Sequence, residues 1–125
     1  MKDRFCGGRA PGLIQEKPMH PVFRFQLEKE HRFFGTGANR LLHLVRDTGS
    51  LLTACREMNM SYSKGRKIVA RMESELGFRV VESRQGGKAG GFSMLTPQAE
   101  ELIEKYDAFT NRAEQILASL FDEYF

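Results

Sequence analysis

Residues 61–71 carry a dense set of hydroxyl and basic side chains whose spacing suits the recognition of a polyanion. They are Ser61, Tyr62, Ser63, Lys64, Arg66, Lys67 and Arg71. Hydroxyl and cationic groups on one helix face can contact base edges in the DNA major groove and the flanking phosphates. We therefore expect these seven residues to bind DNA. Many amphipathic helical hairpins have a solvated basic face and bind nothing, which is the alternative.

Two short helices must position these side chains. Asn59 interrupts a first helical pattern, and Ser61 can begin a second helix by accepting backbone N–H bonds. Gly77 ends that helix. The apolar face of the first helix is Leu51, Ala54, Cys55 and Met58, and that of the second is Gly65, Ile68, Val69, Met72 and Leu76. The pattern predicts a helix-turn-helix over residues 50–77.

A β-hairpin is predicted directly after the second helix. Residues 78–83 and 92–95 have the composition of short strands, and residues 84–91 form a glycine-rich loop between them. The loop contains Arg84 and Lys88. A basic hairpin in this place is typical of the wing of a winged helix-turn-helix, so we expect Arg84 and Lys88 to contact the DNA backbone or the minor groove.

Residues 50–77 resemble the helix-turn-helix of LysR-type regulators, and the chain from about residue 22 to 120 resembles more closely the N-terminal DNA-binding domain of the ModE family of molybdate-responsive repressors. The LysR-type likeness lies in Ser50, Ala54, Ser61, Val69, Glu73, Leu76 and Gly77. The ModE likeness lies in Gly49-Ser50, Met60-Ser61-Tyr62, the glycines 86, 87, 90 and 91 around Lys88, Leu95-Thr96, and Leu102, Ile103, Tyr106 and Asp107.

This resemblance implies DNA binding and dimerisation. ModE regulators of full length continue past a long helix into a molybdate-binding portion, whereas this sequence ends at Phe125. We therefore expect no direct molybdate binding. Lys64-Gly65-Arg66 replaces the small or aromatic residues of the family's recognition helix, so the operator sequence is not implied.

The remaining elements complete a single domain over residues 22–125. Residues 1–21 are rich in proline and glycine and are expected to be disordered. Residues 22–28 alternate as a strand with one buried face, and residues 38–48 form a helix that ends at Gly49. The expected fold class is mainly α with a small β-hairpin wing, a winged helix-turn-helix with a long C-terminal helix.

The C-terminal helix is predicted over about residues 97–122, with Thr96 as its cap and Pro97 at its first position. One of its faces repeats with the spacing of a coiled-coil seam, formed by Leu102, Tyr106, Phe109, Ala113, Ile116 and Leu120. We expect this seam to be the interface of a homodimer. The alternative is that the helix packs only on its own domain.

The charge is unevenly distributed along the 125 residues. Residues 1–88 hold 17 Lys and Arg against 9 Asp and Glu, whereas residues 89–125 hold 2 against 7. A basic part set apart from an acidic part is typical of a protein with one nucleic-acid-binding face.

Enzymatic and metal chemistry have little support. His20, His31 and His43 show no ligand spacing with each other or with Cys6 and Cys55. The glycine-rich loop lacks the GxxxxGK[ST] pattern of a phosphate-binding loop. We predict no catalytic residue, no metal and no cofactor. With no signal peptide or membrane-spanning run in the sequence, we expect a cytoplasmic protein without a membrane partner.

These observations together predict a sequence-specific DNA-binding transcriptional regulator that acts as a homodimer on double-stranded DNA. Two alternatives stay open: a weakly specific, nucleoid-type DNA binder, and a protein-interaction module of the same fold.

Overall fold

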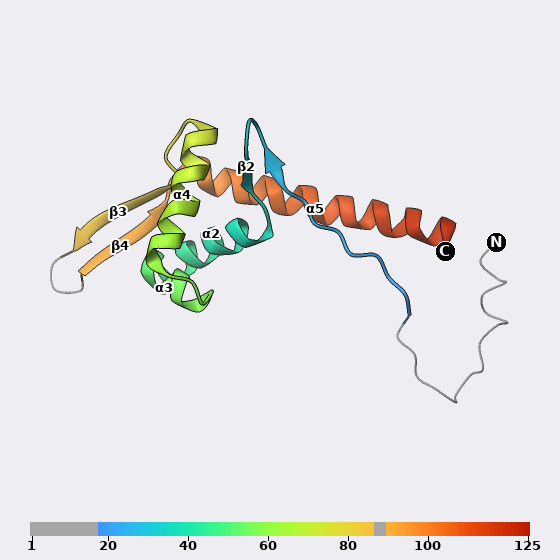
Figure 1. Ribbon diagram of the computed structural model, residues 1–125, viewed down its shortest axis with the longest axis horizontal. Coiled ribbons are helices and arrows are strands. Elements are labelled where there is room, and N and C mark those ends of the chain that lie inside the picture. The colour runs from blue at the N-terminus through green and yellow to red at the C-terminus, as the bar shows by residue number, and fades with distance from the viewer. Residues whose placement is uncertain (1–17, 87–89) are drawn as a thin grey trace, which may run out of the picture. The chain divides into compact units, whose positions relative to one another are not determined.

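Helices dominate the part of the chain that the computed structural model describes, residues 18–86 and 90–125 (Figure 1). They are α2 (Thr36–Thr48), α3 (Leu51–Glu57), α4 (Tyr62–Leu76) and α5 (Pro97–Tyr124). Two antiparallel two-stranded sheets accompany them, β1 (Leu27–Glu28) with β2 (Arg32–Phe34), and β3 (Val81–Gly86) with β4 (Gly90–Leu95). The predicted fold class is confirmed at this level, mainly α with a small β-hairpin.

The chain divides into two compact units. One is Arg24–Asp107, and the other combines the two ends of the chain, Met1–Phe23 and Ala108–Phe125. The first unit contains the hydrophobic core and every site described below. The predicted disordered segment, residues 1–21, falls mostly on residues 1–17, which lie outside the described part of the chain.

Local signals in the sequence set the helix ends. The Ser50 and Ser61 side chains accept from the backbone N–H groups of Thr53 and Lys64, each at 3.0 Å, and so begin α3 and α4. The Thr96 hydroxyl accepts from Ala99 N at 3.2 Å at the start of α5. Gly77 ends α4 with a φ of 83°, in the left-handed region that favours glycine.

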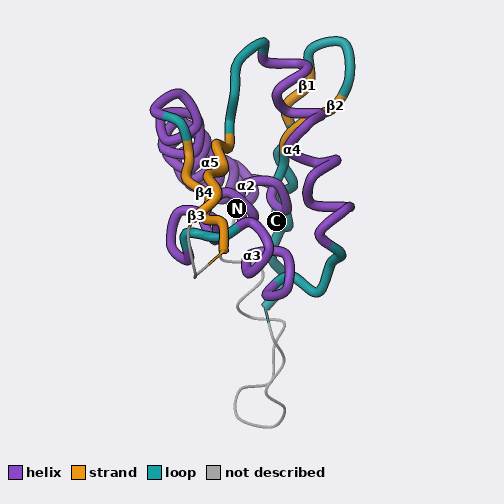
Figure 2. The backbone as a smooth tube through the Cα atoms, turned by 90° about the vertical axis from the view of Figure 1, so that its left-hand side faces the viewer, coloured by secondary structure: helices purple, strands orange, loops and turns teal. Residues whose placement is uncertain are grey.

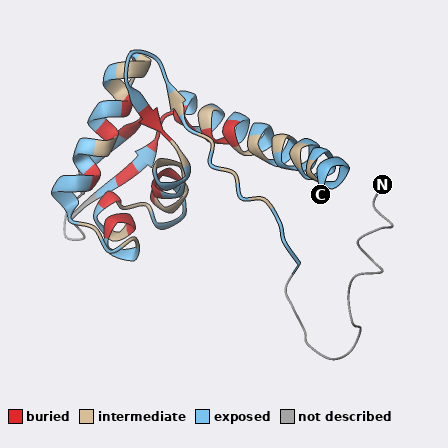
Figure 3. Cartoon of the chain, turned by 45° about the vertical axis from the view of Figure 1, so that its right-hand side comes forward, coloured by how far each residue is buried: buried red, intermediate tan, exposed pale blue. Residues whose placement is uncertain are grey.

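The core of the Arg24–Asp107 unit collects the inward faces of its elements (Figure 3). Phe34, Leu41, Leu42, Val45, Met72, Val80 and Ile103 are among its fully buried side chains. Phe34 and Tyr106 meet edge to face with ring centroids 4.9 Å apart. The Tyr106 hydroxyl donates to the carbonyl oxygen of Phe25 at 2.6 Å, which ties the segment before β1 to α5.

The predicted strand over residues 22–28 is wrong in extent. The structure has a strand only at Leu27–Glu28, where these two residues pair with Phe34 and Arg32 of β2. The loop predicted over residues 84–91 is also too long, since β3 continues to Gly86 and β4 begins at Gly90. Figure 2 shows that the β1–β2 hairpin, which the sequence did not predict, lies alongside α4.

Candidate anion-binding site

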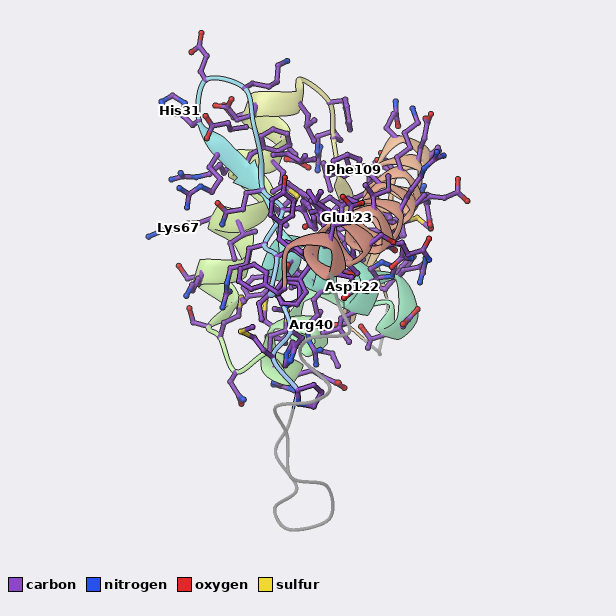
Figure 4. All side chains as sticks on the ribbon, turned by 90° about the vertical axis from the view of Figure 1, so that its right-hand side faces the viewer. His31, Arg40, Lys67, Phe109, Asp122 and Glu123 are labelled. Carbon is purple, nitrogen blue, oxygen red and sulfur yellow. The ribbon has the colours of Figure 1, made fainter. Side chains whose placement is uncertain are left out.

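The polar face of α4 is exposed as predicted. Tyr62, Ser63, Lys64, Arg66, Lys67 and Arg71 are all exposed, while Gly65, Val69 and Met72 are buried. Figure 4 shows Lys67 pointing outward from α4, on the side where the hairpin residue His31 lies. The helix therefore presents its cations to solvent and its small and apolar residues to the core.

The cations of α4 divide between two hollows. Lys64, Lys67 and Arg71 face the β1–β2 hairpin, because residues three and seven positions apart share a helix face. Tyr62 and Arg66 instead line a hollow of about 340 Å³ against β3, where the Arg66 guanidinium lies 5.9 Å from the Tyr62 ring centroid. The DNA-contacting residues expected on one surface thus lie on two sides of the helix.

A cavity of about 450 Å³ lies between the β1–β2 hairpin, the start of α2 and α4. We call it the basic cavity. Among the described residues, its lining contains five cationic side chains and no acidic one, namely Arg24, Arg32, Lys64, Lys67 and Arg71. Its other lining residues are Phe25, Gln26, Phe33, Phe34, Gly35, Thr36, Gly37, Ala38 and Ile68. Exposed cations and buried or half-buried apolar side chains therefore line the same cavity.

The start of α2 adds hydrogen-bond donors to this cavity. The cap residue Gly35 has no side chain to satisfy the first backbone N–H groups, and the first turn contains no acidic residue. Thr36, Gly37 and Ala38 of that turn line the cavity, and a Cβ placed on Gly37 would meet no atom within 4 Å. Free N–H groups and the positive end of the helix dipole both favour an anion here.

The five cations have no direct ionic partner among the residues that the structure describes. Within the described residues, none of them forms an ion pair or a side-chain hydrogen bond, whereas Arg46 and Arg79 do. Like charges gathered around one hollow repel each other and raise the local concentration of anions. The geometry and the charge together make the basic cavity a candidate site for an anionic ligand with an apolar part.

Sequence reasoning found the α4 side of this cavity and missed the opposite side. Arg24 lies before β1 and Arg32 begins β2, about forty residues before Lys67 and Arg71 in the chain. The only signal was the alternation of residues 22–28, which places Arg24 and Gln26 on the exposed face. Thr36 and Gly37 were also missed, because the predicted helix began at residue 38.

The remaining predicted site residues lie elsewhere. Arg84 is exposed on β3, and Lys88 lies outside the described residues. Of the predicted dimer seam, Tyr106 is buried in the core of its own chain and Leu102 packs against that core. Phe109, Ile116 and Leu120 are exposed, and Ala113 is half-buried. A dimer interface at these residues stays a prediction.

The histidines and cysteines do not assemble into a ligand set within the described residues. His31 pairs with Glu75 at 2.9 Å and His43 with Asp107 at 2.8 Å, while His20 lies 3.4 Å from the Pro18 carbonyl. The described part of the chain contains no group of three His, Cys, Asp or Glu able to hold a metal ion. Cys55 is buried beside Gly65, and this burial raises the pKa of its thiol.

Among the described helices, none combines the length and apolar character needed to cross a membrane. No model of a known protein family matches the sequence. The chain is 37% identical over 93 residues to the molybdenum-pterin-binding protein MopB of Rhodobacter capsulatus. The match covers 74% of this chain and 34% of MopB, so the chain spans about a third of the length of that relative.

This likeness relates the chain to a molybdenum-associated protein and corrects two of the expectations from sequence. The relative is named for binding a molybdenum-pterin and not for regulating transcription, so the predicted DNA-binding regulator is wrong, and its two alternatives do not fit either. The expectation of no direct molybdate binding is wrong for the same reason. The sequence prediction failed because a basic helix face suits any polyanion, and DNA is only one of them.

Proposed function

We propose that this chain binds an anionic molybdenum-pterin in the basic cavity. The proposal starts from the likeness to MopB, which is named for such a ligand. A molybdenum-pterin combines a flat heteroaromatic ring with negatively charged oxygen groups. A site for it therefore needs cations or N–H donors for the oxygens and an apolar surface for the ring.

The single observation that carries the proposal is the set of five cations around one hollow, with no acidic side chain among the described residues of its lining. Hydrogen bonds from Arg or Lys to a charged oxygen are roughly twice as strong as those between neutral groups. Lys64, Lys67 and Arg71 on one side and Arg24 and Arg32 on the other could contact the oxygens from two directions. The first turn of α2 would add backbone donors.

The apolar residues in the lining support a ligand larger than a free oxyanion. Phe25 and Ile68, both half-buried, offer hydrophobic surface next to the cations. A ring placed on this surface removes apolar area from water, at about 25 cal/mol per Å². We therefore expect a molybdenum-pterin to bind more tightly than molybdate, which can use only the cations and N–H donors of the cavity. The proposal is one of binding, and it assigns no catalytic residue.

We further infer that the scaffold is a winged helix-turn-helix. Its support is the element order, in which α3 and α4 are joined by a short turn at residues 58–61 and followed directly by the β3–β4 hairpin. Backbone bonds tie this hairpin to the helices, since Ser93 N donates to the Gly49 carbonyl at 2.8 Å. In this proposal the fold positions α4 next to the β1–β2 hairpin, so that the two elements form the basic cavity between them.

Calorimetric titration of the purified chain with a molybdenum-pterin released from a molybdoenzyme tests the proposed function, with molybdate and sulfate as comparison ligands. Each charge-assisted contact contributes about 1.5–3 kcal/mol, so the single variants Lys67→Ala and Arg71→Ala should each weaken binding roughly tenfold or more. The matched control is Arg66→Ala, which removes a cation from the same helix on its other side.

The control variant should bind as the unchanged chain does. Circular dichroism of each variant verifies that it is folded. Equal affinity for all three ligands, or an equal loss in the Arg66→Ala control, would refute binding in the basic cavity.

A further inference from the structure

One carboxylate joins the two sides of the basic cavity. The backbone N–H groups of Glu30 and His31, in the turn between β1 and β2, donate to Oε1 of Glu75 at 3.1 and 3.2 Å. The ring Nδ1 of His31 pairs with Oε2 at 2.9 Å. The Glu75 side chain is 12% exposed. Three hydrogen bonds from the hairpin turn therefore end on a single side chain of α4.

The elements that Glu75 joins carry the cations. Arg32 follows the turn directly and lines the cavity from the hairpin, while Lys67 and Arg71 line it from α4. The hairpin is short, since β1 has two residues and β2 has three. Such a hairpin has little stability of its own and depends on its contacts with other elements. Its position relative to α4 then depends on these bonds and on the buried rings of Phe33 and Phe34.

We propose that Glu75 is a positioning residue for the basic cavity, holding the β1–β2 turn against α4 so that Arg32 faces the cations of that helix. This inference rests on the proposed function, because it concerns the same cavity. It adds a residue that touches no ligand and acts through the hairpin.

The negative charge of Glu75 indicates that its role in the cavity comes from its hydrogen bonds to the turn and not from contact with the ligand. A carboxylate close to an anion-binding cavity attracts the cations and repels the ligand, so by electrostatics alone it should weaken binding. The hydrogen bond from His31, followed by those of the backbone N–H groups, lowers the pKa of Glu75, so it stays ionised at neutral pH. Glu75 favours ligand binding in another way, because it orders the turn between β1 and β2. The two effects have opposite signs, and this makes the role testable.

The test compares Glu75→Ala with Glu75→Gln in calorimetric titrations with the molybdenum-pterin. Both substitutions remove the negative charge, but the glutamine amide oxygen can still accept from the Glu30 and His31 N–H groups. Glu75→Ala should weaken binding roughly 3- to 10-fold, because the competent arrangement of the hairpin becomes a minor population. Glu75→Gln should bind as tightly as the unchanged chain or more tightly. The matched control is Glu57→Gln, an exposed glutamate at the end of α3.

Hydrogen exchange without ligand gives an independent readout. The Glu30 and His31 amides should exchange faster in Glu75→Ala than in the unchanged chain, while the amides of α2 keep their protection. Unchanged exchange at these two amides, or ligand binding by Glu75→Ala as tight as or tighter than that of the unchanged chain, would overturn the positioning role alone. Absence of binding by the unchanged chain would overturn the proposed function, and the positioning role with it.

Discussion

Gly65 is the position on α4 where the addition of one methyl group should have the largest effect. It is buried against α3, and a Cβ built on it would lie 2.2 Å from Sγ of Cys55. Carbon and sulfur atoms cannot approach to this distance, so the helix or the cysteine must move. The Cys55 side chain is only 1% exposed and has little free space into which to move. Gly65→Ala should therefore separate α3 from α4.

The expected magnitude follows from two opposing effects. Overpacking a core typically costs about 1–3 kcal/mol, and a clash this close belongs in the upper part of that range. Replacing glycine by alanine inside a helix gains about 1 kcal/mol of helix propensity. We expect Gly65→Ala to lower the free energy of unfolding by about 1–2 kcal/mol. Because α4 carries three cations of the basic cavity, the affinity of the Gly65→Ala variant for the ligand should fall as well.

Urea denaturation followed by circular dichroism measures this change, and a double variant isolates its cause. Cys55→Ala removes the sulfur atom, so Gly65→Ala should be tolerated better in the Cys55→Ala background than in the unchanged chain, by about 1 kcal/mol or more. If Gly65→Ala instead stabilises the chain by the full helix propensity, or if its effect is the same in both backgrounds, the packing argument fails.

Two further predictions concern the hairpin side of the cavity. The pKa of Glu75 is lowered from about 4.5, so its bonds should stabilise the fold fully above about that pH and lose this effect as the pH falls through the lowered pKa. The stability difference between the unchanged chain and Glu75→Gln, measured by urea denaturation across this range, should shrink towards acid, and a constant difference would contradict it. Tyr106→Phe removes the hydrogen bond to the Phe25 carbonyl but keeps the ring against Phe34, so it should cost about 0.5–1.5 kcal/mol in the same assay. A neutral result would show that this bond does not hold the segment before β1.

The helices could be predicted because their signals are local. Ser61 caps α4, Gly77 ends it with a positive φ, and Thr96 with Pro97 begins α5, each as expected from a few adjacent residues. The buried faces of α3 and α4 followed from helical periodicity. Periodicity also placed Tyr106 on an apolar face of α5, and its side chain is buried in the core of its own chain.

The basic cavity could not be predicted because it depends on contacts between distant parts of the chain. Arg24 and Arg32 line the same cavity as the cations of α4 because the β1–β2 hairpin docks through Glu75 and through the buried rings of Phe33 and Phe34, and no pattern within residues 22–34 specifies that partner. Helical periodicity correctly placed the basic side chains of α4 on an exposed face, but the sequence did not show that this face forms one side of a hollow. A helix-turn-helix pattern then favoured DNA over a small anionic ligand.

The central claim is that the molybdenum-pterin binds in the basic cavity, and a titration followed by ¹H–¹⁵N NMR tests it most directly. On addition of the ligand, backbone amide shifts should change at Thr36 and Gly37 and at the α4 residues Lys64, Lys67 and Arg71. The amides of residues 108–124 should stay unchanged. A short duplex DNA, added as a polyanion control, should not reproduce the pattern. Shifts centred outside the cavity, or the same shifts with the duplex, would contradict the account.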